Sequence, residues 1–159
     1  MQNDQFTHYA QKYMNTVFRI ALNYLGSPDT ADDITQEVFL RLYKVKTVFE
    51  SEEHVRNWLI RVTINECKRD FSSFWRKVEP LDEATSKPYF SSSEARELFQ
   101  EVMTLPRKYR VVIYLHYYEG YTTKEIAQML RSKQSTVLTQ LERGRNLLKN
   151  MLSDSVRKN

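Results

Sequence analysis

The chain has 159 residues, a formal net charge of +4 and 41% hydrophobic residues, enough for one domain or two small ones with real cores. Its single cysteine excludes an internal disulfide and favours a reducing, cytoplasmic setting. No signal sequence or long apolar span is present, which argues against export and membrane insertion. With only 3 Gly and 4 Pro and no alternating strand-like runs, the sequence predicts an all-α protein.

Three helices are predicted before residue 70. The first carries an apolar stripe from Phe6 to Leu25 and ends at Gly26, a residue type that favours helix C-termini. Ser27-Pro28-Asp29 then provides a cap, a first-turn proline and an acidic residue for the second helix. Ser51 is the expected cap of a third helix with apolar and basic faces.

A break in periodicity divides the chain. Residues 79–93 contain Pro80, Pro88 and the run Ser91-Ser92-Ser93, which predicts a flexible linker between a domain at 1–78 and a domain at 94–159. We expect Ser93 to cap the next helix, which would bury four apolar residues: Leu98, Phe99, Val102 and Met103.

The run from Leu105 to Leu148 predicts a helix-turn-helix motif that binds DNA. Leu105-Pro106 opens a helix that Gly120 ends, and Thr122-Thr123-Lys124-Glu125 is a capping box for a short second helix. After Arg131, we expect Ser132 to cap a longer helix with Val137, Leu141, Leu147 and Leu148 on its buried face.

The charge distribution favours DNA binding over the alternative of a small helical bundle that only packs against another part of a protein. Residues 94–159 hold 12 Lys+Arg against 7 Asp+Glu, whereas residues 1–76 hold 10 of each and residues 77–93 hold 2 against 3. The positive excess therefore lies in the C-terminal part, as expected of a phosphate-binding module.

The sequence contains no recognisable set of catalytic or metal-binding residues. The histidines His8, His54 and His116 have no Cys or carboxylate partners at metal-ligand spacing, and there is no glycine-rich phosphate loop. The sequence therefore predicts no catalytic residues, no metal, no cofactor and no small-molecule substrate.

Three motifs stand in register along the chain: Asp32-Asp33-Ile34-Thr35-Gln36-Glu37-Val38-Phe39, then Trp58-Leu59-Ile60-Arg61 ahead of Asn65, and finally Leu105-Pro106 through Arg145. Together they resemble the extracytoplasmic-function (ECF) sigma factors of the sigma-70 superfamily in bacteria. The resemblance implies a non-enzymatic protein that gives core RNA polymerase its promoter specificity in transcription initiation. Its first domain would bind the polymerase clamp helices and melt the -10 element, and its second would read the -35 element.

The resemblance also assigns residues to these contacts. The polymerase contact falls on Asp33, Gln36 and Glu37. The -10 strand would lie on the third helix and its preceding loop, residues 46–57, with Arg56, Arg61, Asn65 and Lys68 as candidates, whereas Trp58 falls on the apolar stripe and is interpreted as core. The -35 contact falls on Gln134, Ser135, Thr136, Leu138, Thr139, Gln140, Arg143 and Arg145, with polar side chains near base edges and the arginines on phosphates.

Some positions depart from the family pattern. Arg131 occupies the turn where the family usually has glycine, and a left-handed backbone there would cost roughly 1 kcal/mol or more. Ser135 replaces a common glycine, and Leu138 and Gln140 replace frequent basic residues. Arg69 stands where an aspartate is usual, which leaves its local ion pairing open.

Two other interpretations remain. One is a stand-alone helix-turn-helix regulator, which would need a ligand pocket or dimer face in the first domain, where the sequence offers an acidic helix and a basic aromatic one. The other is a decoy that binds polymerase or an anti-sigma factor but hardly touches DNA. If the chain is a sigma factor, the resemblance also implies an anti-sigma factor that holds it inactive.

Overall fold

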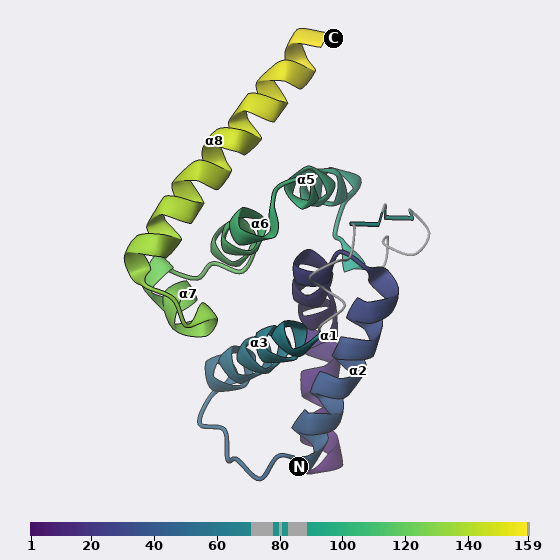
Figure 1. Ribbon diagram of the computed structural model, residues 1–159. Helices are drawn as coiled ribbons and strands as arrows, with labels where there is room; N and C mark the ends of the chain where they lie inside the picture. Colours follow the sequence, from purple (N-terminus) through teal and green to yellow (C-terminus); the bar gives the residue numbers. More distant parts are fainter. Residues whose placement is uncertain (71–77, 80, 83–88, 159) are drawn as a thin grey trace. The chain divides into compact units, whose positions relative to one another are not determined.

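The computed structural model describes residues 1–70, 78–79, 81–82 and 89–158. All regular secondary structure in those residues is helical, which confirms the all-α class (Figure 1). The chain divides into two compact units, Met1–Pro80 and Leu81–Asn159. Residues 80 and 83–88 of the expected linker lie outside the described residues. No helix in the described ranges is both long and apolar enough to cross a bilayer.

The first unit is a three-helix bundle of α1 (Asn3–Leu25), α2 (Pro28–Lys44) and α3 (Glu52–Arg69). Helix α2 packs along α1, and α3 packs against both (Figure 1). One cluster of buried side chains joins all three helices: Tyr13, Val17, Val38, Phe39, Leu42, Val55 and Leu59.

The helix ends of this unit follow the expected caps. Gly26 adopts a left-handed conformation at φ 75° and its N–H donates to the Leu22 carbonyl at 2.8 Å. The hydroxyl of Ser27 accepts from the Thr30 N–H, and that of Ser51 accepts from the His54 N–H at 3.1 Å. These local bonds set where α2 and α3 begin and hence where the loop between them lies.

The second unit contains α5 (Ser93–Met103), α6 (Arg107–Ile113), a π-helical turn η3 (Tyr114–Tyr118), α7 (Thr123–Leu130) and α8 (Gln134–Lys158). Helix α8 packs against α6 and α7, and α5 packs against α6. Buried side chains from these elements form its core, among them Phe99, Val102, Ile113, Leu115, Ile126, Val137 and Leu141.

Four local expectations for this unit were wrong. The cap of α5 is Ser92, whose hydroxyl accepts from the Ala95 N–H at 3.1 Å, rather than Ser93. Ser132 does not begin α8, because its N–H donates back to the Ala127 carbonyl at 2.9 Å and closes α7 instead. Leu98 and Leu147 are 43% and 40% exposed, since the described residues of this unit leave these positions of α5 and α8 uncovered.

The helix expected from Pro106 to Gly120 changes form at Tyr114. The Glu119 N–H donates to the Tyr114 carbonyl five residues earlier, at 3.3 Å, which widens the turn into a π-helix. Tyr114 and Tyr118 stack at 5.0 Å between ring centroids, and the buried Tyr114 hydroxyl donates to Glu119 at 2.7 Å. This turn keeps Tyr114 buried while Tyr117 is 53% exposed.

Candidate nucleic-acid interface

Helices α7 and α8 and the turn between them form the helix-turn-helix that the sequence predicts. The capping box at the start of α7 is complete, because Thr122 accepts from the Glu125 N–H at 3.1 Å and Glu125 accepts from the Thr122 N–H at 3.0 Å. At its end, Arg131 has φ 55° and ψ 46°, the left-handed conformation expected for the glycine position of this turn. Two local motifs therefore fix the direction in which α8 leaves α7.

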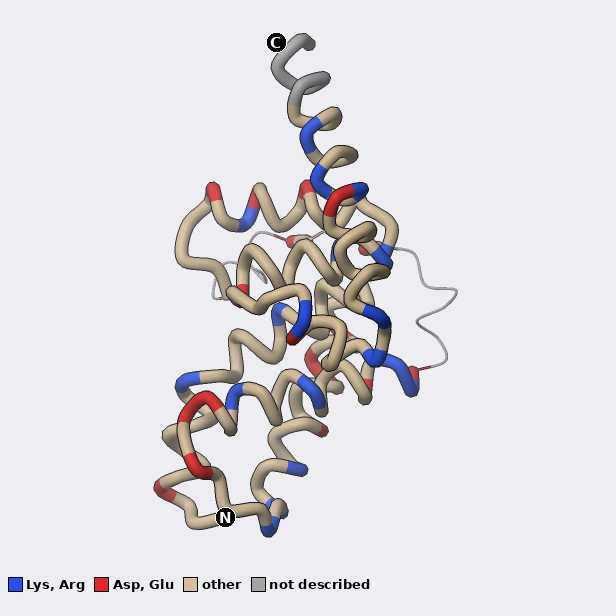
Figure 2. Tube along the Cα trace, turned by 90° about the vertical axis from the view of Figure 1, so that its left-hand side faces the viewer, with Lys and Arg blue, Asp and Glu red and all other residues tan. Residues whose placement is uncertain are grey.

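Helix α8 has a narrow buried side and a broad exposed side. Val137, Leu141 and Gly144 are buried at helical spacing. Most residues expected to face DNA are exposed, namely Gln134, Ser135, Thr136, Leu138, Thr139, Arg143 and Arg145, and Gln140 is half-buried beside the core stripe. The structure thus places the predicted -35 residues on one connected surface of α8, whose basic residues appear in blue in Figure 2.

Several of these side chains already have partners. The Gln134 amide donates to the Thr123 hydroxyl at 3.2 Å, which ties the start of α8 to the start of α7. The Thr139 hydroxyl donates to the Ser135 carbonyl at 3.0 Å, so its oxygen is left to accept. Farther along α8, Arg143 lies near the Tyr109 hydroxyl, and Arg145 donates to the Tyr117 hydroxyl at 3.1 Å.

The predicted polymerase residues lie together on α2. Asp33, Gln36 and Glu37 are all exposed, and their spacing of three and four residues puts them on one side of the helix. Leu40, which is 53% exposed, extends the same side by one turn. An acidic and amide surface with one apolar side chain at its end suits a basic partner groove.

A buried carboxylate connects that helix to α3. Glu66 has a side chain only 11% exposed, and it accepts from Arg41 of α2 at 2.8 Å and from Arg69 at 3.2 Å. Arg41 also contacts Glu37 at 3.4 Å. Arg69, the departure from the family pattern, thus adds a second cation to Glu66, because a desolvated carboxylate needs charged partners.

The four -10 candidates on α3 do not form a single group. Arg61, Asn65 and Lys68 follow one another at spacings of four and three residues and so share a side of the helix. Arg56 lies five residues before Arg61, roughly 140° around the helix at 3.6 residues per turn. The structure therefore brings three candidates together and leaves Arg56 on another side.

The loop between α2 and α3 borders a hollow. Its volume is about 650 Å³, and it is lined by Met1, Gln2, Gln5, Tyr9, Val45, Lys46, Thr47, Val48 and Phe49. The Phe49 ring packs edge-on against Tyr9, His54 and Trp58 at centroid distances of 6.5, 5.1 and 5.8 Å. Trp58 packs partly buried against the core, in agreement with its interpretation as a core residue.

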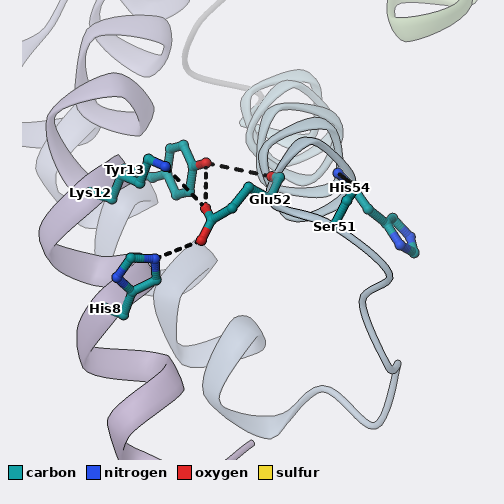
Figure 3. Close-up of polar contacts among 6 residues, drawn as sticks. All are labelled: His8, Lys12, Tyr13, Ser51, Glu52 and His54. Carbon is teal, nitrogen blue, oxygen red and sulfur yellow. Dashed lines mark hydrogen bonds and ion pairs between the residues drawn. The ribbon is translucent and has the colours of Figure 1, made fainter.

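Glu52, the first residue of α3, holds this loop to α1 (Figure 3). Its carboxylate contacts His8 at 2.6 Å, accepts from the Tyr13 hydroxyl at 2.8 Å and pairs with Lys12 at 3.3 Å. The hydrogen bond with His8, followed by that from Tyr13, holds the pKa of Glu52 below its ordinary value. A charged Glu52 therefore fixes the end of the loop that the sequence places on the -10 strand.

Comparison with known proteins agrees with both units. Residues 9–79 match the family model of sigma-70 region 2, and residues 95–148 match that of sigma-70 region 4. The chain belongs to the ECF sigma factors. As a sigma factor it binds core RNA polymerase and promoter DNA and directs promoter recognition in transcription initiation.

Individual relatives are distant in sequence but similar in extent. The ECF RNA polymerase sigma factor SigW of Bacillus subtilis is 26% identical, with 95% of this chain and 90% of the relative covered. The RNA polymerase sigma factor SigV of the same organism is 28% identical, with 86% and 84% covered. The sigma factor RpoE, solved with the anti-sigma factor NepR from Bartonella quintana, has the same fold, with a TM-score of 0.70 at 17% identity over 94% of this chain and 97% of that one.

Sequence reasoning missed several residues at these candidate surfaces. Leu40 was overlooked because an exposed leucine on an amphipathic helix looks like part of the buried stripe until its angular position is worked out. Lys133, exposed directly before α8, offers a cation beside the first backbone N–H groups of that helix, and its position could have revealed it. Tyr109 and Tyr117 give no such signal, because their contacts with α8 depend on the tertiary fold.

Proposed function

We propose that this sigma factor reads the -35 element with the exposed side of α8 and grips polymerase and the -10 strand with its first unit. The observation that carries the proposal is the outward surface of α8, where polar side chains follow a fixed turn and two arginines flank them. A helix presented in this way fits the major groove, where base edges can be distinguished.

On α8, we assign base contacts and phosphate contacts to different residues. Gln134, Ser135, Thr136, Thr139 and Gln140 supply hydrogen-bonding groups near the N-terminal turns, and Leu138, which is 50% exposed, suits a thymine methyl. Arg143 and Arg145 are assigned to phosphates, which fix the register without reading sequence.

In the first unit, we assign the -10 strand to the α2–α3 loop and the adjoining side of α3. Arg61, Asn65 and Lys68 provide two cations and an amide on one side of the helix, and Arg56 provides a third cation nearer the loop. The hollow beside Lys46 and Phe49 fits the need of a melting module for space and a cation near an unstacked base.

Asp33, Gln36 and Glu37 of α2 are assigned to the polymerase clamp helices, and we add Leu40 at the end of that surface. Residues 79–93 act as the tether between a domain at 1–78 and one at 94–159, so that two modest affinities combine on one polymerase and one promoter. We further propose a cytoplasmic location beside the polymerase, no catalytic activity of its own, and an anti-sigma factor as a regulatory partner, because a solved sigma factor of the same fold was captured with one.

The -35 assignment is tested by comparing Gln140→Ala with the double variant Arg143→Ala and Arg145→Ala. Duplexes selected from a random pool should show a changed sequence preference with Gln140→Ala. The double variant should bind every duplex more weakly and keep the original preference. Equal loss on all sequences from both proteins would contradict the role of Gln140 as a base reader.

The polymerase assignment is tested with charge reversal on α2. Asp33→Lys should weaken binding to core polymerase, whereas Asp32→Lys, an exposed neighbour about 100° around the same helix, should leave it nearly unchanged. Equal effects of the two substitutions would remove the support for this surface and leave only a general charge effect.

A further inference from the structure

Helix α8 passes unusually close to α6 at Gly144. A Cβ atom on this residue would lie 3.0 Å from Cγ1 of Ile113 and 3.2 Å from Cβ of Tyr109. Gly144 is buried, so the two helix backbones approach here without a side chain between them. The crossing therefore depends on glycine for its closeness.

The residues on each side of Gly144 are the two arginines assigned to phosphates. At about 100° of rotation per residue, Arg143 and Arg145 leave α8 on opposite flanks of the crossing. Each meets a tyrosine of the preceding helices: Arg143 lies near the hydroxyl of Tyr109 of α6, and Arg145 Nη1 donates to the hydroxyl of Tyr117 at 3.1 Å. An arginine thus lies beside a tyrosine hydroxyl on both flanks.

The positions of the two tyrosines follow from the helix that carries them. Tyr109 lies on α6 beside Gly144, with the Lys108 ammonium 5.0 Å from the centre of its ring. Tyr117 belongs to the π-helical turn, where Tyr114 is buried and Tyr117 is exposed. Its ring also packs edge-on against His116 at 4.9 Å, which limits its freedom.

We propose that Tyr109 and Tyr117 are positioning residues that hold Arg143 and Arg145 on the two flanks of α8, ready for phosphates on either side of the groove. This inference rests on the proposed -35 contact of α8. A guanidinium has five N–H donors, so one hydrogen bond to a tyrosine oxygen leaves the others for phosphate. A side chain ordered before binding loses less freedom when DNA arrives, and affinity rises accordingly.

The test uses the full chain and a pool of labelled duplexes of random sequence, because phosphate contacts do not depend on sequence. Tyr109→Phe and Tyr117→Phe keep the rings and remove only the hydroxyls. Each should weaken binding about threefold, the effect expected from one side chain that must be ordered on binding. The slope of affinity against salt should stay unchanged, because the phosphates are still contacted. Arg145→Ala, in contrast, should reduce that slope by about one.

A double-mutant cycle separates positioning from a general structural effect. Tyr117→Phe should have no further effect in the Arg145→Ala background, and Tyr109→Phe none in the Arg143→Ala background. Tyr118→Phe is the matched control in the same turn, because its buried hydroxyl has no hydrogen-bond partner among the described residues, and it should leave DNA affinity unchanged.

The other possible results distinguish a failure of the positioning role from a failure of the phosphate contact. Unchanged or tighter binding by the tyrosine variants, with weaker binding by the arginine variants, would overturn the positioning role, and tighter binding would mean that the hydroxyls compete with phosphate. Additive effects in the cycle would overturn it as well. Full affinity of the arginine variants would instead refute the phosphate contact of α8 itself.

Discussion

Arg131 provides the most direct test of how the turn of the helix-turn-helix motif is formed. It is the one described non-glycine residue with a positive φ, at φ 55° and ψ 46°, and its side chain is exposed. A left-handed backbone costs an L-residue with a Cβ roughly 1 to 2 kcal/mol, and glycine avoids this cost. Glycine loses part of the gain through its larger freedom in the unfolded chain. We therefore expect Arg131→Gly to stabilise the second unit by about 1 kcal/mol.

Arg131→Ala is the matched control, because it removes the same charge and side chain but keeps the Cβ atom and the strain. The sequence of the second unit contains no tryptophan, so tryptophan fluorescence cannot follow this change. Hydrogen exchange of the α7 and α8 amides reports on the second unit directly. Exchange should slow about fivefold in Arg131→Gly relative to Arg131→Ala. Equal exchange in both variants would refute the strain argument.

Three further substitutions follow from the described contacts. Tyr118→Phe should stabilise the protein by about 1 kcal/mol near neutral pH, since it removes a buried hydroxyl without a partner among the described residues. Burial raises the pKa of Tyr118 to about 12 from the ordinary tyrosine value of 10.0. The wild type should therefore lose stability as the pH rises from 10.0 toward 12, and urea unfolding at alkaline pH should show that the variant lacks this loss. Glu52→Gln should cost less than about 1 kcal/mol at pH 7. This difference in stability should vanish as the pH falls below 4.5 and through the lowered pKa of Glu52. A difference that stays constant with pH would contradict a stabilising contact between the charged Glu52 and His8. Gly144→Ala should destabilise by about 1 kcal/mol in urea unfolding, because the crowding of a new Cβ against buried Ile113 outweighs the gain in helix propensity; a more stable variant would show that the crossing can relax.

The helix boundaries were predictable because their signals are local. Ser27, Ser51 and the pair Thr122–Glu125 each bond to backbone within three residues, so the sequence alone contains the whole motif. The error at the start of α5 has the same origin. Three consecutive serines can all cap a helix, and local chemistry does not distinguish Ser92 from Ser93.

Contacts between helices were not predictable in the same way. An amphipathic pattern indicates which residues can be buried, but Leu98 and Leu147 are exposed because the described part of the second unit does not cover them. The π-helical turn at Tyr114 occurs together with a buried bond from the Tyr114 hydroxyl to Glu119, and apolar periodicity reveals neither.

In the candidate surfaces too, features set by local helical spacing were predictable and contacts with distant residues were not. The exposed side of α8 and the Asp33 surface of α2 follow from helical spacing, and the structure places their residues together. Arg56 was grouped with Arg61 as a cation of the third helix, yet helix geometry separates them. The partners of Arg143 and Arg145 come from residues 34 and 28 positions away, Tyr109 and Tyr117, beyond any local pattern.

The central claim is that this protein directs core RNA polymerase to promoters through both units. Run-off transcription with purified bacterial core polymerase and fragmented DNA from the source genome, followed by sequencing of the transcripts, tests it most directly. With the protein present, we predict new start sites that share two upstream motifs, and loss of these transcripts with Arg143→Ala plus Arg145→Ala. Binding to core polymerase without any specific transcript would contradict the account and favour a decoy, and no binding to polymerase would favour a stand-alone regulator.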